Sequence, residues 1–346
     1  MTNDIKVPNV SDKTYFILNR EAYDRERLDD LMKSGKPIQT EKNSYWYVEK
    51  IKRDNDTGLD AVVVSQGKKT KDGKWVKSDN PENVVVAFAG TDPKSQFFQD
   101  VIDADGGNVV MGLDPKKKEH YIVEKDAKDT SKTLGKYNGT PSQDSMLSTG
   151  KYKLITKTSQ IGQADDLVLE VKQKYKGTST VISTTGHSLG GAEAEYSAVN
   201  NNVYAVAFNS PSIVHLHSEE QQKKINNGEY DRSIKSIINP DDMVGAGWWN
   251  EYDRSIKSII NPDDMVGAGW WNEYDRHNGT TIYTKDPELS NAVREARMQG
   301  DVFQQIGQNA GYFFQTAILG MPDTHWVGSN NFTFDKNGNV QNIEGD

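Results

Sequence analysis

The residues with the clearest chemical meaning are the five consecutive residues Gly186–Gly190, GHSLG, which match the pattern G-x-S-x-G. The pattern follows a β-branched run, STVISTT at 179–185, and precedes AEAEYSAV at 192–199, which is typical of a helix. A strand, a sharp turn and a helix in this order present a serine nucleophile in hydrolases of the α/β type. We therefore predict that Ser188 is a nucleophile. The alternative is a glycine-rich turn whose serine only caps the helix.

The turn also predicts where a developing oxyanion would be held. Glycine suits a turn too tight for side chains on its neighbours, and the helix that follows directs its positive N-terminal end at the serine. The backbone N–H of Leu189 is one expected donor. The loop after an earlier strand supplies the other, and Gly90–Thr91, after VVVAFA at 84–89, is the candidate.

A serine hydroxyl needs a base, and in this fold the chain order is serine, acid, histidine. His215 and His217 precede the acid candidates, so they are in the wrong order. His277 lies in a charged turn, EYDRHNG, which is also typical of a surface histidine. We expect His325, which follows a long apolar run, to be the base and keep His277 as the alternative.

The acid candidates lie in the segment NPDDMV, which follows a predicted strand at 233–238. Sheet enzymes place catalytic groups at the carboxyl ends of strands. Asp241 and Asp242 therefore qualify, and a simple Asn-Pro-Asp turn is the alternative. A second copy of the segment offers Asp263 and Asp264 equally well.

That second copy belongs to a perfect tandem duplication. EYDRSIKSIINPDDMVGAGWWN occupies 229–250 and recurs letter for letter at 251–272. Repeat architectures have more units, and these diverge, so two identical units indicate a recent natural or engineered duplication. We expect the 22 extra residues to be surplus to the fold. The spare copy would pack on the surface, loop out or support a dimer.

The remaining pattern predicts a single α/β domain spanning 1–346 with a mostly parallel central sheet flanked by helices. Apolar runs without alternation at 84–89 and 203–208 are typical of strands buried on both faces. Helices are expected at 23–32, 160–176, 189–198 and 286–298. The polar stretch 113–150 is interpreted as an insertion or mobile loop, and the lysine-rich stretch 67–83 as a solvated hairpin or loop.

Composition excludes several classes of protein. A formal net charge of −9 argues against a nucleic-acid-binding protein. The absence of cysteine excludes disulfides, thiolate catalysis and cysteine metal sites, and we expect neither a metal nor a cofactor. The N-terminus lacks the apolar core of a secretory signal, and no apolar run is long enough to cross a bilayer. A cytoplasmic location or export by a leaderless route is therefore expected.

With these motifs together, the chain resembles the class 3 lipase family, a branch of the α/β-hydrolases, over roughly residues 40–340. The resemblance rests on VVVAFAGTD at 84–92, GHSLGG at 186–191, NPDDMV and DTHWVGSNNF at 323–332. It implies an α/β-hydrolase fold, a triad of Ser188, Asp242 (or Asp264 in the second copy) and His325, and an oxyanion hole of Thr91 and Leu189. Ala89 departs from the family, which often has arginine there. The chain is also similar to Gram-positive bacterial lipase-like proteins.

The leading hypothesis is a lipase or phospholipase A that acts on lipid esters through an acyl-enzyme, with transient contact to a lipid surface. A soluble esterase for short-chain esters is the second hypothesis. The third is a lipase-like scaffold whose triad the duplication has impaired.

Overall fold

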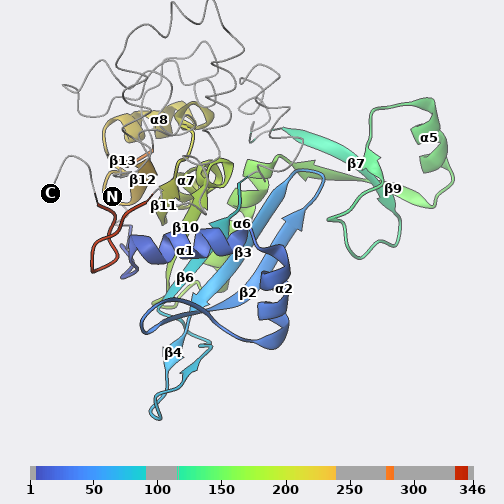
Figure 1. Ribbon diagram of the computed structural model, residues 1–346. Coiled ribbons are helices and arrows are strands. Elements are labelled where there is room, and N and C mark those ends of the chain that lie inside the picture. Colours follow the sequence, from blue (N-terminus) through green and yellow to red (C-terminus); the bar gives the residue numbers. More distant parts are fainter. Residues whose placement is uncertain (1–4, 91–114, 116, 239–277, 284–331, 342–346) are drawn as a thin grey trace, which may run out of the picture.

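The computed structural model describes residues 5–90, 115, 117–238, 278–283 and 332–341 (Figure 1). Thr91, Asp241, Asp242, Asp263, Asp264, His277 and His325 lie outside these ranges, as does the helix predicted at 286–298.

The described residues build a curled eight-stranded sheet in the order β1-β2-β3-β6-β10-β11-β12-β13. Its strands are Ile38–Glu41, Ser44–Asp54, Leu59–Gln66, Asn83–Phe88, Val181–His187, Tyr204–Phe208, Ile234–Ile238 and Thr280–Tyr283. The pairs from β6 to β13 are parallel, whereas β1, β2, β3 and β6 pair in antiparallel fashion. This is the mixed α/β architecture expected from the sequence, with a mostly parallel centre.

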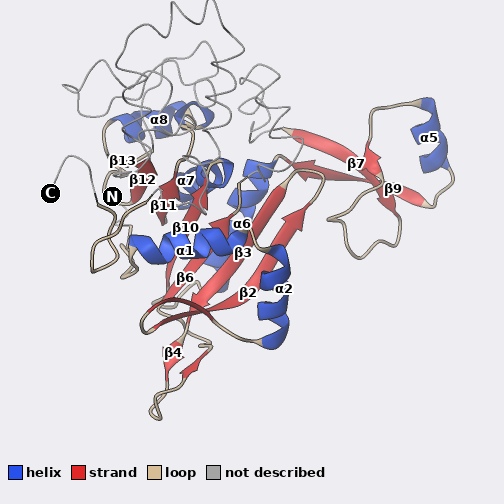
Figure 2. Cartoon of the chain, in the orientation of Figure 1, coloured by secondary structure: helices blue, strands red, loops and turns tan. Residues whose placement is uncertain are grey.

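Helices cover both faces of this sheet (Figure 2). Helices α1 (Asp12–Ala22) and α2 (Arg25–Ser34) pack on one face. Helices α6 (Gln160–Lys174), α7 (Leu189–Asn201) and α8 (Glu219–Asn226) contribute to the core on the other. None of the helices in the described ranges is long and apolar enough to cross a membrane.

Strand β6 shows why the central strands read as continuous apolar runs. Val85 and Ala87 point into the core under α1, while Val84, Val86 and Phe88 point into the core under α6 and α7. Every residue of β6 is buried because each face of the strand is covered. The runs at 84–89 and 203–208 are therefore the buried strands that were predicted.

Two smaller units extend from the sheet. A hairpin of β4 (Lys68–Lys69) and β5 (Trp75–Val76) follows β3, as the lysine-rich stretch predicted. The second unit, residues 117–158, contains β7 (Lys118–Glu124), β8 (Gly135–Lys136), α5 (Pro141–Ser148) and β9 (Tyr152–Thr158). Its strands form a separate three-stranded sheet, β8-β7-β9.

The regular structure of this second unit argues against a mobile loop at 113–150, whereas the alternative of an insertion stays a prediction. Antiparallel pairing between Lys118–Glu124 and Tyr152–Thr158 gives the segment regular structure despite its polar composition. The helix expected at 23–32 is also displaced, since Tyr23 ends α1 and the next helix begins at Arg25.

Candidate functional site

The turn around Ser188 is a strained strand-to-helix junction. Strand β10 ends at His187 and α7 begins at Leu189, so Ser188 is the only residue between them. Its backbone has φ 56° and ψ −130°, a conformation that costs on the order of 1–3 kcal/mol for a residue other than glycine. The predicted strand, turn and helix are all present.

Hydrogen bonds hold this strained turn in place. The Ser188 N–H donates to the carbonyl of Phe208 in β11, at 3.0 Å. The Ser188 carbonyl accepts from the N–H groups of Gly191 at 2.8 Å and Ala192 at 3.2 Å. The neighbouring strand and the first turn of α7 thus fix the serine backbone from both sides.

The glycines of the motif are required by close backbone approach. A Cβ atom on Gly186 would lie 1.8 Å from the Gly190 carbonyl oxygen, and one on Gly190 would lie 2.3 Å from the Phe88 carbonyl oxygen. Real Cβ atoms essentially never approach backbone atoms below 3.0 Å. Glycine at 186 therefore lets the turn close on itself, and glycine at 190 lets the turn pack against the end of β6.

The end of β6 lies directly beside the serine. A Cβ atom on Gly90 would lie 2.5 Å from the His187 carbonyl oxygen and 3.2 Å from the Ser188 Cβ atom. This is where the sequence predicted the oxyanion-hole loop. Of the two predicted donors, Leu189 is the first residue of α7, so its N–H has no acceptor within the helix. Thr91 falls outside the described residues.

Tyr23 is a contributor to this region that the sequence did not reveal. Its hydroxyl accepts the Gly90 N–H at 2.8 Å, lies 2.9 Å from His187 Nδ1, and lies 3.4 Å from the His187 carbonyl oxygen. The residue that ends α1 thereby ties the end of β6 to the residue before Ser188. No local pattern signals this contact, because Tyr23 and His187 are 164 residues apart.

The first copy of the duplicated segment provides a strand of the main sheet. Ile234–Ile238 forms β12, which pairs in parallel with β11 on one side and with β13 on the other. The strand stops four residues before Asp242, at the same edge of the sheet as Ser188. The corresponding residues of the second copy, and all the acid candidates, lie outside the described residues.

His215 and His217, the two described histidines that follow Ser188, lie in surroundings that favour their uncharged form. The ring of His217 is buried, stacks on Tyr196 with centroids 4.8 Å apart, and has Nε2 3.1 Å from the Asn278 side-chain amide. Burial lowers the pKa of His217 to about 3, so the ring is neutral, and burial also lowers the pKa of His215. His277 and His325 lie outside the described residues, so the choice of base stays a prediction.

Helix α7 also carries two fully buried carboxyl groups, whose burial was not predicted from the sequence. Burial raises the pKa of Glu193 well above its usual value and that of Glu195 to about 7. The Ser236 hydroxyl donates to Glu195 at 2.6 Å, which joins α7 to β12. Within the described ranges, no group of three acidic or histidine side chains is arranged to hold a metal ion.

Comparison with known proteins gives distant likenesses among solved structures. No family model matches the chain, and no curated protein matches it. Among solved structures, a triacylglycerol lipase from Penicillium expansum aligns over 81% of this chain and 84% of its own, with a TM-score of 0.31 and 16% identity. An acetyl xylan esterase from a Thermoanaerobacterium species aligns over 86% of this chain and 94% of its own, with a TM-score of 0.27 and 12% identity.

Proposed function

We propose that the protein is a serine hydrolase of carboxylic esters, with Ser188 as the nucleophile. The observation that carries the proposal is the elbow itself. Ser188 has a positive φ between a parallel strand and a helix, and glycines at 186 and 190 are packed too tightly for any other residue. Strain of this kind persists at functional sites because the surrounding structure imposes it.

The proposed reaction proceeds through an acyl-enzyme. The Ser188 hydroxyl attacks the ester carbonyl carbon while its proton passes to a histidine, for which we propose His325 with Asp242 or Asp264 as its orienting acid. The tetrahedral oxyanion accepts a hydrogen bond from the Leu189 N–H, with Thr91 as the proposed second donor. The alcohol leaves with the proton held by the histidine. A water molecule then attacks the acyl-enzyme while the histidine takes its proton, and this proton returns to the Ser188 oxygen as the carboxylic acid is released.

We further propose that the natural substrates are lipid esters, of the kind cleaved by lipases or phospholipases A. The support is the sequence resemblance described above. A soluble short-chain esterase is the competing function, and the two differ in acyl-chain preference. A series of p-nitrophenyl esters from acetate to palmitate separates them, since rates falling steeply with chain length would favour the short-chain esterase.

The decisive experiment is covalent labelling with a fluorophosphonate, read by intact mass. The wild-type protein should gain one phosphonyl adduct, and Ser188→Ala should gain none. Ester hydrolysis in Ser188→Ala should fall by ~10³-fold or more, which is typical of a triad serine. Ser210→Ala is a matched control, because Ser210 is also buried at this edge of the sheet but its hydroxyl donates to the Pro211 carbonyl. Unlabelled wild-type protein would instead favour an impaired scaffold.

A further inference from the structure

Residues 117–158 form a projecting unit that we call the basic arm. It consists of the sheet β8-β7-β9 and helix α5, and in Figure 1 it extends to the right, away from the helices that cover the main sheet. None of the residues of α5 is buried. The arm therefore offers a large surface that the rest of the described chain does not cover.

The charge of the arm is opposite to that of the whole chain. The arm carries nine lysines against five acidic residues, whereas the chain has a formal net charge of −9. Exposed lysines that form no ion pair with a described residue share this surface, namely Lys118, Lys125, Lys128, Lys132, Lys151 and Lys153. Three of them gather at the distal end of the β7-β9 pair. There the Lys125 N–H donates to the Lys151 carbonyl and Lys153 lies opposite Val123.

The same small sheet also carries exposed apolar side chains, of which Leu154 follows Lys153 in β9 and therefore points to the opposite face. Leu154 is 41% exposed and Leu134 is 57% exposed, which makes them two of the few large apolar side chains open to solvent in the described ranges. Both lie next to the buried Ile122, since Leu154 is its strand partner and the Leu134 N–H donates to its carbonyl. Basic and apolar side chains thus share one small sheet.

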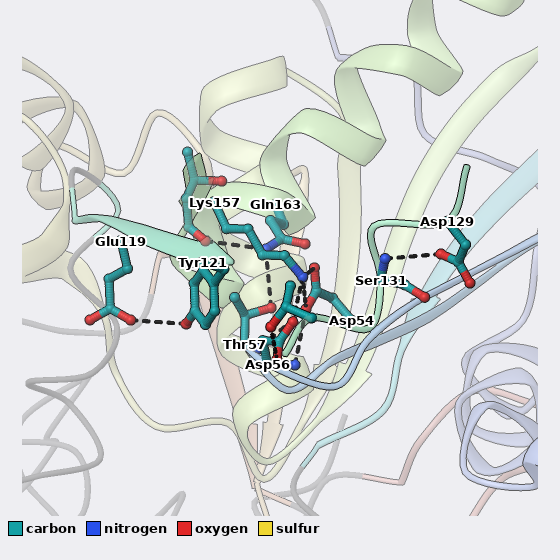
Figure 3. Close-up of polar contacts among 11 residues, drawn as sticks. Asp54, Asp56, Thr57, Glu119, Tyr121, Asp129, Ser131, Lys157 and Gln163 are labelled. Carbon is teal, nitrogen blue, oxygen red and sulfur yellow. Dashed lines mark hydrogen bonds and ion pairs between the residues drawn. The ribbon is translucent and has the colours of Figure 1, made fainter. Parts of the chain in front are cut away.

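The arm is attached at the catalytic edge of the main sheet. β3 runs antiparallel to β6, so the β2–β3 turn lies at the edge where β6 and β10 end and where Ser188 is placed. Figure 3 shows the attachment, in which the Lys157 ammonium of β9 reaches Asp54 at 2.8 Å and Asp56 at 2.7 Å. Strands are spaced about 4.8 Å apart, so Asp54 and Ser188 are separated by on the order of 15 Å across the sheet.

This attachment fixes the direction of the arm. The side chain of Lys157 is only 6% exposed, and breaking a buried ion pair leaves an uncompensated charge. Further contacts reinforce it: Thr133 donates to Asp56 at 2.9 Å, and Lys157 lies 5.3 Å from the centre of the Tyr121 ring. The arm is therefore held in one orientation relative to the edge that carries Ser188.

We propose that the basic arm docks the protein on an anionic phospholipid surface. Lysines near an anionic bilayer and leucines that enter its interfacial region are the combination that binds such a surface. A purely electrostatic partner would not need the exposed leucines. The proposal deepens the proposed function, because docking through the arm would bring the Ser188 edge of the sheet to lipid esters.

The test measures binding of the full chain to vesicles, with Ser188→Ala used so that hydrolysis cannot change the lipid. Vesicles of phosphatidylcholine alone are compared with vesicles containing phosphatidylglycerol. The arm variant combines Lys125→Gln, Lys151→Gln and Lys153→Gln. The control variant removes three exposed lysines from the opposite edge of the sheet and so changes net charge equally; it combines Lys68→Gln, Lys69→Gln and Lys71→Gln.

We expect binding that requires phosphatidylglycerol and weakens with salt. Each lysine near an anionic surface contributes about fivefold to partitioning, so the arm variant should bind on the order of 100-fold more weakly and the control variant nearly as tightly as the parent. Leu154→Ser should also weaken binding, but without changing its salt dependence. Equal losses in the arm and control variants, or no binding to phosphatidylglycerol vesicles, would overturn the proposal.

The failure of this proposal is distinguishable from failure of the proposed function. With Ser188 restored, the arm variant should react with fluorophosphonate and cleave a soluble ester at the parental rate. Vesicle binding without fluorophosphonate labelling would refute the proposed hydrolase and support the docking surface. Labelling without vesicle binding would support the hydrolase and refute the docking surface.

Discussion

The Tyr23 hydroxyl offers a sharp test of how the elbow is positioned. Tyr23→Phe removes one oxygen atom, and with it the acceptor for the Gly90 N–H and the partner of His187 Nδ1. The ring still fills the same space against His187, with centroids 6.0 Å apart. The change therefore breaks the link between the end of β6 and the residue before Ser188.

The size of the effect follows from the cost of an unpaired polar group. Leaving a buried N–H without an acceptor costs ~1–3 kcal/mol, and the lower end applies because Gly90 is only partly buried. If the freed loop moves, the loss falls on the transition state, since the oxyanion donors act there. We expect kcat for a soluble ester to fall by roughly five- to tenfold with little change in KM.

Tyr15→Phe is the matched control. Tyr15 lies on the same helix, and its hydroxyl donates to Ser183 of the same strand, β10, at 2.8 Å. That bond is in the body of the sheet and not at the edge that carries Ser188. Steady-state kinetics and chemical denaturation of both variants should show comparable losses in stability, but a lower kcat only for Tyr23→Phe. An unchanged kcat in Tyr23→Phe, or equal kinetic losses in the two variants, would refute the positioning role.

Further predictions concern the acid, the base and a buried carboxyl group. Of Asp242→Asn and Asp264→Asn, one should abolish most esterase activity and the other should be nearly silent; we expect Asp242 to be the sensitive one, and an active double variant would exclude this acid loop. His325→Ala should match the loss in Ser188→Ala while His277→Ala does little, and the opposite kinetic result would move the base to His277. Burial raises the pKa of Glu195 from 4.5 to about 7, so only the folded state holds this proton between those pH values. The free energy of unfolding should therefore fall by about 3 kcal/mol over that interval, and denaturation of Glu195→Gln should lack this part of the pH dependence.

The sequence was most informative where local pattern and burial coincide. The run at 84–89 and the motif at 186–190 predicted β6, β10 and the start of α7, because a strand covered on both faces must be apolar throughout and a tight elbow must contain glycine. The predicted helix at 160–176 is likewise present as Gln160–Lys174.

Contacts between segments that are distant in the chain could not be predicted from local sequence pattern. Lys157 lies in a polar stretch and resembles a solvated lysine, and only the fold brings Asp54, 103 residues away, into contact with it. Tyr23 and the buried Glu195 are further examples, because they belong to helices and their partners lie on strands far away in the sequence. The regular structure of 118–158 was not predicted, because most of its strand residues are polar and exposed and so lack the apolar pattern of a buried strand.

The second copy of the duplicated segment lies entirely within one connection of the main sheet. β12 and β13 are adjacent parallel strands, and the connection between them, residues 239–279, contains the entire second copy. Parallel neighbours need a crossover of about a dozen residues, and roughly 20 would remain if the second copy were absent. Doubling such a connection costs only about 0.6 kcal/mol in closure entropy. By this measure, a segment of 22 residues can be gained or lost in frame between β12 and β13 at little cost in closure entropy.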